Sequence, residues 1–265
     1  MIRQCIPLSL FLGMIIVLSG CGGKNSTPSS MTGTPVSFSG NYELTAVSQS
    51  TPGVNFFIRG FLEDDASGMI TGSVPGTSIG GGCFNTVGGT LTGSVDSAGN
   101  LSLSFQSGDR LHLLSIKGAL SADKQTITGS FTTDSVCGGT GTVAGFAMQP
   151  FTGTYKGSVT TAGGTLNLSF VSNQGTINSG FGTLPLTGTI NLADSGVCAI
   201  LPPPPSFQLV GAAAGAAVNM DSPKGVELPA LIFTGTATDH TATVIKGTIF
   251  LDGCVVAIPL VLTKQ

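Results

Sequence analysis

The chain has 265 residues, carries a formal net charge of -3 at pH 7, and contains only 9% charged residues. A typical soluble domain has about 25% charged residues, and here Thr, Ser and 40 Gly take their place. The few basic residues form neither a stripe for nucleic acid nor a polybasic patch for anionic lipid, so nucleic acid is excluded as a partner.

The first segment is an apolar run from Ile6 to Leu18, preceded by a single positive charge at Arg3. The run is about 13 residues, too short to span a bilayer, and it fits the hydrophobic region of a secretory signal. It ends in Leu18-Ser19-Gly20-Cys21, which resembles the lipobox of bacterial lipoproteins with a type II signal peptide. The resemblance implies cleavage before Cys21 and acylation of this cysteine, with palmitate among its acyl chains, so that the chain is anchored to a bilayer.

The residue after the lipobox is Gly22. In lipoproteins of double-membraned bacteria an Asp at this position signals retention in the inner membrane, so the resemblance implies the cell outer membrane. Two alternatives stay open: an ordinary cleaved signal peptide with an incidental Cys21, and an uncleaved anchor, which Pro7 disfavours. We expect a signal peptide over residues 1–20 and a flexible tether over residues 21–37, with a reach of about 20 Å.

Two halves of the chain share a pattern. Phe38-Ser39-Gly40-Asn41-Tyr42 returns as Phe151-Thr152-Gly153-Thr154-Tyr155, and short strand-like runs and two cysteines follow each copy. We interpret this as an internal repeat, with β module 1 over residues 38–149 and β module 2 over residues 150–265.

A five-residue pattern with apolar ends and a central glycine recurs in both modules. Its copies are Ile70–Val74, Leu91–Val95, Ile127–Phe131, Leu186–Ile190, Phe233–Ala237 and Ile245–Ile249. Because strand side chains alternate, the glycine shares the buried face with the apolar residues and lets the sheet curve. Turn sequences such as Asp64–Gly68 and Asp96–Asn100 separate the runs. For Gly211–Ala217 we favour a packed strand pair over a short helix. The predicted fold is all-β: two tandem antiparallel β-barrels or β-sandwiches of about eight strands each, with little helix.

The cysteines predict disulfides. Cys5 leaves with the signal peptide, and the even set that remains after Cys21 comprises Cys83, Cys137, Cys198 and Cys254, as expected of an exported chain. Separations of about 54 and 56 residues favour Cys83–Cys137 and Cys198–Cys254, each stabilising by about 4 kcal/mol. No C-x-x-C spacing is present, and only two histidines could join a zinc site, so we expect no metal.

No motif in the sequence predicts catalysis. Gly76–Gly80 has the spacing of a nucleophile elbow but lacks a following helix, and Gly138–Gly141 is predicted to be a turn beside a disulfide. Glu63-Asp64-Asp65 predicts a solvated hairpin tip rather than a calcium site. We place His112 on the outward face of a strand and His240 in a turn, each without an identifiable partner. Pro202–Pro205 predicts a stiff loop, with binding to a proline-recognising partner as the alternative.

The sequence as a whole predicts a non-enzymatic lipoprotein of the cell envelope with a structural or interaction role and no cofactor. Its expected partners are the bilayer, through acylated Cys21, and an envelope protein. The alternative is binding of an apolar small molecule inside barrels that are similar to those of lipocalins and avidins, although the chain has no Trp; a remote alternative is an envelope hydrolase. The ligand, the side of the membrane and the oligomeric state stay open.

Overall fold

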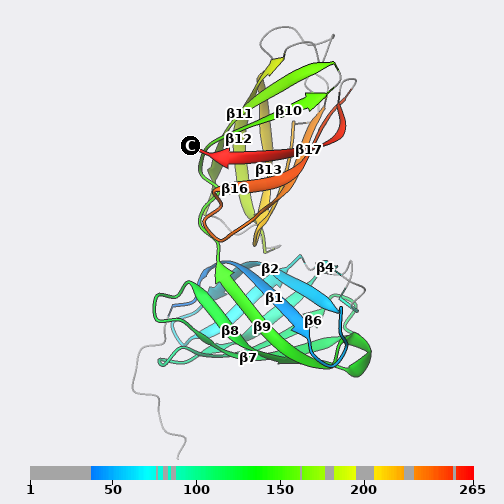
Figure 1. Cartoon of the computed structure of the whole chain (residues 1–265). Coiled ribbons are helices and arrows are strands. Elements are labelled where there is room, and N and C mark those ends of the chain that lie inside the picture. Colours follow the sequence, from blue (N-terminus) through cyan, green and yellow to red (C-terminus); the bar gives the residue numbers. More distant parts are fainter. Residues whose placement is uncertain are drawn as a thin grey trace, which may run out of the picture. The chain divides into compact units, whose positions relative to one another are not determined.

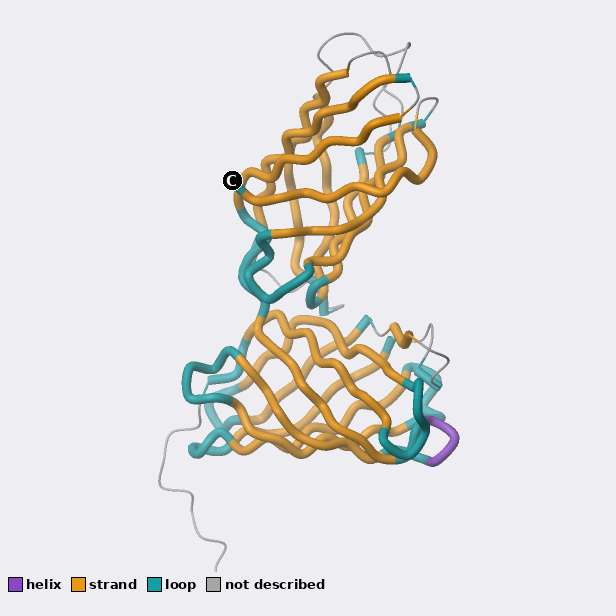
Figure 2. Tube along the Cα trace, viewed as in Figure 1, coloured by secondary structure: helices purple, strands orange, loops and turns teal. Residues whose placement is uncertain are grey.

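The structure is a computed structural model that describes residues 37–75, 77–79, 83–84, 88–161, 163–176, 182–194, 206–223, 230–252 and 255–265. In these ranges almost every regular element is a β-strand, and the one helical element is a 3-10 turn, η1 (Ser135–Cys137) (Figure 2). The predictions on Cys21, Cys198, Cys254 and Pro202–Pro205 lie outside the described residues.

The first half of the chain forms a closed barrel of eight antiparallel strands, barrel 1 (Figure 1). Consecutive strands of the ring pair with each other, and β1 pairs with both β2 and β9, which closes it. A short additional strand, β4 (Thr77–Ile79), pairs with β2. The eight strands are β1 (Gly40–Ser48), β2 (Asn55–Asp64), β3 (Met69–Val74), β5 (Gly89–Val95), β6 (Asn100–Ser107), β7 (Leu113–Leu120), β8 (Thr126–Thr132) and β9 (Thr140–Ala147).

The second half forms barrel 2, again with eight antiparallel strands in chain order. It closes where Tyr155 and Lys156 of the first strand pair with Lys264 and Thr263 of the last. The prediction of two all-β modules of about eight strands is confirmed. The sequence left barrel and sandwich open for these modules, and both modules are closed barrels. The strands are β10 (Gly153–Thr161), β11 (Gly164–Gln174), β12 (Leu184–Asp194), β13 (Ser206–Ala214), β14 (Ala217–Asp221), β15 (Leu231–Ala237), β16 (Val244–Leu251) and β17 (Val255–Lys264). The predicted strand pair over Gly211–Ala217 is the β13–β14 hairpin.

The five-residue pattern lies on strands in the predicted orientation. In all six copies the first and last residues are buried, the second is exposed and the glycine is half-buried. Glycines face each other across two strand pairs, Gly118 and Gly129 on β7–β8 and Gly235 and Gly247 on β15–β16. A Cβ atom on Gly129 would lie 2.3 Å from the Lys117 carbonyl oxygen and 2.7 Å from the Gly118 Cα. The backbones therefore approach too closely for any side chain at this point.

Buried aromatic and aliphatic side chains occupy the interior of each barrel. Phe56 and Phe131 pack edge-on in barrel 1, with their ring centroids 5.1 Å apart, and both are about 1% exposed. In barrel 2, Phe170 packs against Tyr155, whose hydroxyl donates a hydrogen bond to the Ala242 carbonyl oxygen at 2.9 Å. Eight-stranded barrels of this size are either filled by side chains or hold one small ligand. In the part of the chain that the structure describes, the buried side chains of each barrel form one continuous cluster.

A largely buried ion pair joins β1 and β2. Glu43 and Arg59 are direct partners in the register, and the Arg59 Nε lies 2.8 and 2.9 Å from the two carboxylate oxygens. The same carboxylate accepts a hydrogen bond from the Ala216 amide at 2.8 Å, and Asn41 exchanges two hydrogen bonds with Gly215. The charge and the lone pairs of the Glu43 carboxylate therefore have partners, as a buried carboxylate requires.

Candidate functional site

A disulfide lies at one end of barrel 1, next to the turn between β8 and β9. Cys83, which follows β4, is bonded to Cys137 at the end of η1, with 5.0 Å between their Cα atoms. This confirms the predicted Cys83–Cys137 pairing. The Cys198–Cys254 pairing stays a prediction, because both residues lie outside the described ranges.

Local hydrogen bonds fix the position of Cys137. Asp134 is the N-cap of η1, and its Oδ1 accepts a hydrogen bond from the Cys137 amide at 2.8 Å. Gly138 and Gly139, with φ of 114° and 65°, then reverse the chain into β9. These left-handed conformations favour glycine, and Ser48 donates a hydrogen bond to the Gly138 carbonyl oxygen. The predicted turn beside a disulfide is confirmed at Gly138 and Gly139, whereas Thr140 and Gly141 already belong to β9.

His112 lies in the turn between β6 and β7, and our prediction of an unpartnered histidine on the outward face of a strand is wrong. Its Nδ1 lies 3.0 Å from the Cys137 Sγ and 3.4 Å from the Asp134 Oδ2, and its ring meets the Phe84 ring edge-on at 6.0 Å. The strand starts only after His112, because Arg110 adopts a left-handed conformation with φ of 61°. Strand alternation therefore does not apply at this position.

The backbone of His112 is held on both sides by one serine. The Ser107 amide donates to the His112 carbonyl oxygen at 3.0 Å, and the His112 amide donates to the Ser107 hydroxyl at 3.0 Å. Asp109 accepts hydrogen bonds from the same hydroxyl and from the Leu111 amide. These hydrogen bonds, led by the one from Ser107, hold the pKa of Asp109 below its ordinary value. The turn that presents His112 is thus closed by Ser107 and Asp109.

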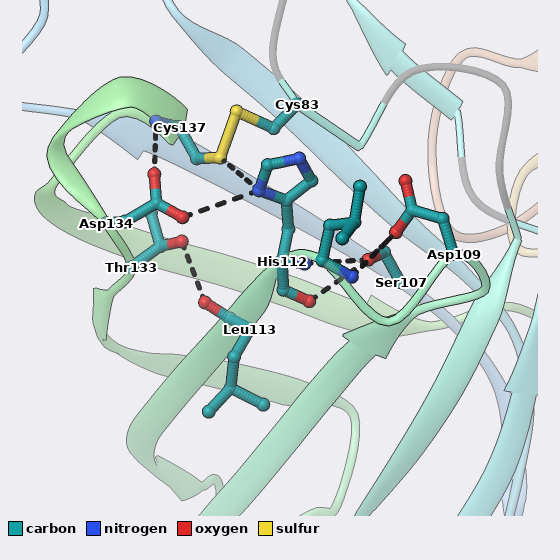
Figure 3. The surroundings of a disulfide bond; sticks show 9 residues. Cys83, Ser107, Asp109, His112, Leu113, Thr133, Asp134 and Cys137 are labelled. Carbon is teal, nitrogen blue, oxygen red and sulfur yellow. Dashed lines mark hydrogen bonds and ion pairs between the residues drawn. A yellow bond between two sulfur atoms is a disulfide. The ribbon is translucent and has the colours of Figure 1, made fainter.

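Four residues from three segments converge at this end of barrel 1, and we call them the Cys–His–Asp cluster: Cys83, His112, Asp134 and Cys137 (Figure 3). One sulfur, nitrogen or oxygen atom of each lies within 4.8 Å of the others. Cys137 is buried, whereas the side chains of His112 and Asp134 are 25% and 47% exposed. In the disulfide form the sulfurs are bonded to each other, so the cluster offers an imidazole and a carboxylate only.

The cluster is not arranged as a hydrolase triad. The Ser107 hydroxyl bonds to the backbone of His112 and to Asp109, and among the described contacts no serine hydroxyl reaches the His112 ring. His240 lies in the β15–β16 turn, as predicted, but not without a partner: its ring lies 5.9 Å from that of Phe146. A general base needs the hydroxyl within hydrogen-bond reach. The remote hydrolase alternative gains no support from these contacts.

The acidic residues at the β2–β3 turn accept hydrogen bonds that stabilise the turn. Asp65 Oδ1 accepts hydrogen bonds from the Ser67 amide and hydroxyl and from the Met69 amide. The bonds from Ser67 and Met69 hold the pKa of Asp65 below its ordinary value. Asp64 accepts a hydrogen bond from the Ser39 hydroxyl at 2.5 Å. The predicted solvated hairpin tip is confirmed for Asp65, whereas Glu63 and Asp64 are the last two residues of β2.

Comparison with known proteins assigns no family to the chain. The sequence matches no protein-family model, and a search of curated proteins found no match. Within the described residues, no helix has the length and hydrophobicity needed to span a membrane.

Proposed function

We propose that the protein is a lipid-anchored component of the bacterial cell envelope, and that its two barrels are non-catalytic interaction modules. The anchor rests on the resemblance of Leu18–Cys21 to a lipobox, and two or more acyl chains hold a protein firmly at a bilayer, at about 0.8 kcal/mol per buried methylene. The interaction role rests on the barrels themselves.

The observation that carries the proposal is the continuous cluster of buried side chains inside each barrel. Fully buried rings such as Phe131 and Phe207 lie where a lipocalin-like barrel would hold its ligand. One hollow lies instead on the outward face of β5, β6 and β7, where Thr92, Ser104 and Lys117 line it. We therefore assign binding to the outer surface of the barrels, where a partner protein could dock.

Exposed apolar side chains at the disulfide end of barrel 1 support a protein partner. Leu111 is 76% exposed, Leu113 is 51% exposed and Val136 is 86% exposed. Leu111 and Leu113 flank His112, and Val136 precedes Cys137. All three therefore lie next to the contact between the His112 ring and the Cys137 sulfur. Exposed apolar groups that gather in one region are typical of protein interaction sites.

The second candidate function is the binding of an apolar small molecule. Closed eight-stranded antiparallel barrels are compatible with a lipocalin-like or avidin-like fold, which is the observation in its favour. To bind in this way, a barrel would have to displace several buried side chains from its interior. We therefore rank this function second.

Mass spectrometry of the natively purified protein tests the proposal. The protein is extracted from membranes in mild detergent, cross-linked and analysed intact and after digestion. We expect the mass of a chain that starts at acylated Cys21, together with cross-links from the disulfide end of barrel 1 to an envelope protein. One apolar molecule bound per chain, without such cross-links, would contradict the proposal and favour the second candidate.

A further inference from the structure

We propose that the Cys–His–Asp cluster, once its disulfide is reduced, is a four-ligand site for a zinc-like divalent cation. The site does not depend on the proposed function, because it involves only residues that the structure places together in barrel 1. It exists in two exclusive forms, since the two sulfurs either bond to each other or bind the metal.

The donor set selects the class of metal. Two thiolates, one imidazole and one carboxylate are the ligands that tetrahedral zinc sites use, whereas calcium and magnesium require six or more oxygen ligands. The cluster provides one donor from each of its four residues and no more. A four-coordinate, borderline-soft cation matches that number and that chemistry.

One pair of donor atoms already has the spacing that a tetrahedral site requires, and the other donors lie close by. Bond lengths of about 2.0–2.3 Å around zinc place neighbouring ligand atoms roughly 3.3–3.7 Å apart. The His112 Nδ1 lies 3.4 Å from the Asp134 Oδ2 and 3.0 Å from the Cys137 Sγ. The Cys83 Sγ is also within 4.8 Å of the other three donors. Breaking the S–S bond frees the sulfurs to separate to the spacing that the metal needs.

Supporting hydrogen bonds already orient three of the four donors. The bond from the Cys137 amide to Asp134 Oδ1 leaves Oδ2 directed at His112. The two backbone bonds to Ser107 fix the turn that presents His112. Such outer hydrogen bonds are a regular feature of metal sites. The partial exposure of Asp134 and His112 gives an ion a path to the buried Cys137.

The two forms interconvert by a balanced two-electron step. A phosphine reductant attacks one sulfur, the S–S bond breaks, and water supplies the oxygen of the phosphine oxide and the protons of two thiols. The cation then binds as both thiols lose their protons to solvent. With two thiolates and one carboxylate around a divalent ion, the occupied site carries one net negative charge.

Cobalt titration of the reduced chain tests the proposal. The full chain is used with Cys5, Cys21, Cys198 and Cys254 replaced by serine, so that only the thiols of the cluster remain. After phosphine reduction, Co²⁺ should bind one ion per chain, with the visible absorption of tetrahedral cobalt and a thiolate-to-cobalt charge-transfer band. Zn²⁺ should displace it and bleach both bands, and the unreduced chain should show neither.

Matched variants locate the site. His112→Ala should weaken Co²⁺ binding about tenfold or more, on the scale by which disturbed metal sites lose affinity, and Asp134→Asn should shift the visible bands. His240→Ala, the other histidine of the chain, should change nothing.

Circular dichroism in the far ultraviolet monitors the fold throughout. A reduced chain that keeps its β-spectrum but binds no Co²⁺ would overturn the proposal, as would binding that is equal in the His112→Ala variant. If reduction unfolds barrel 1, Zn²⁺ should restore its spectrum; failure to do so would also overturn the proposal.

Discussion

Gly129→Ala tests the close approach of the β7 and β8 backbones in barrel 1. The added Cβ would lie 2.3 Å from the Lys117 carbonyl oxygen and 2.7 Å from the Gly118 Cα. Both atoms belong to the backbone, so no side-chain rotation relieves the contact and the two strands must separate. Overpacking of this kind costs about 1–3 kcal/mol. The smaller entropy of the unfolded alanine chain offsets about 0.4–1 kcal/mol of that cost.

We expect Gly129→Ala to lower the free energy of unfolding by about 1–2 kcal/mol, which moves the melting temperature of a domain of this size by about 4–8 °C per kcal/mol. Urea unfolding followed by far-ultraviolet circular dichroism measures the change. Thr128→Ser, on the neighbouring exposed position, is the control and should stay within about 0.5 kcal/mol of wild type. A Gly129→Ala chain as stable as wild type would refute the reasoning.

Three further predictions concern the disulfide, the ion pair and the tyrosines. Replacing both cysteines of the disulfide by serine removes a link across 54 residues and should cost about 4 kcal/mol in urea unfolding; an unchanged midpoint would contradict this. Glu43→Ala leaves the largely buried Arg59 without its carboxylate and should cost about 3–5 kcal/mol, whereas Glu63→Ala, at an exposed carboxylate, should melt like wild type. Burial raises the pKa of Tyr42 and Tyr155, the two tyrosines of the chain, to about 12. Their neutral forms therefore stabilise the fold below pH 10 and lose this effect as the pH rises towards 12; phenolate absorbance should appear near pH 12 in the folded chain, and a midpoint at pH 10 would argue against their burial.

The sequence predicts the barrels because their signal is local. Alternation and the central glycine of copies such as Ile127–Phe131 identify the strands and their buried faces. Closure has no such signal: it depends on pairing of β1 with β9 and of β10 with β17, which lie at opposite ends of each module. These distant pairings decide whether each sheet closes into a barrel or forms a sandwich. Composition and periodicity therefore could not distinguish the two architectures.

The candidate site could be predicted only in part. Equal spacing identified the Cys83–Cys137 pair, and the Gly-Gly sequence after Cys137 identified its turn. The approach of His112 and Asp134 could not be predicted, because it depends on the left-handed Arg110 and on the closed ring. One signal was present in the sequence: Asp134 stands three residues before Cys137, the spacing of an N-cap that bonds to the amide of a later residue.

Fractionation of cells that express Cys21→Ser tests the lipid anchor, the central claim of the proposed function, most directly. The control is Cys5→Ser, at a cysteine that the predicted cleavage removes, and this variant should stay in the outer-membrane fraction with wild type. We predict that Cys21→Ser appears in the soluble periplasmic fraction without acyl groups on its intact mass. A Cys21→Ser chain that stays bound to the membrane would contradict the anchor.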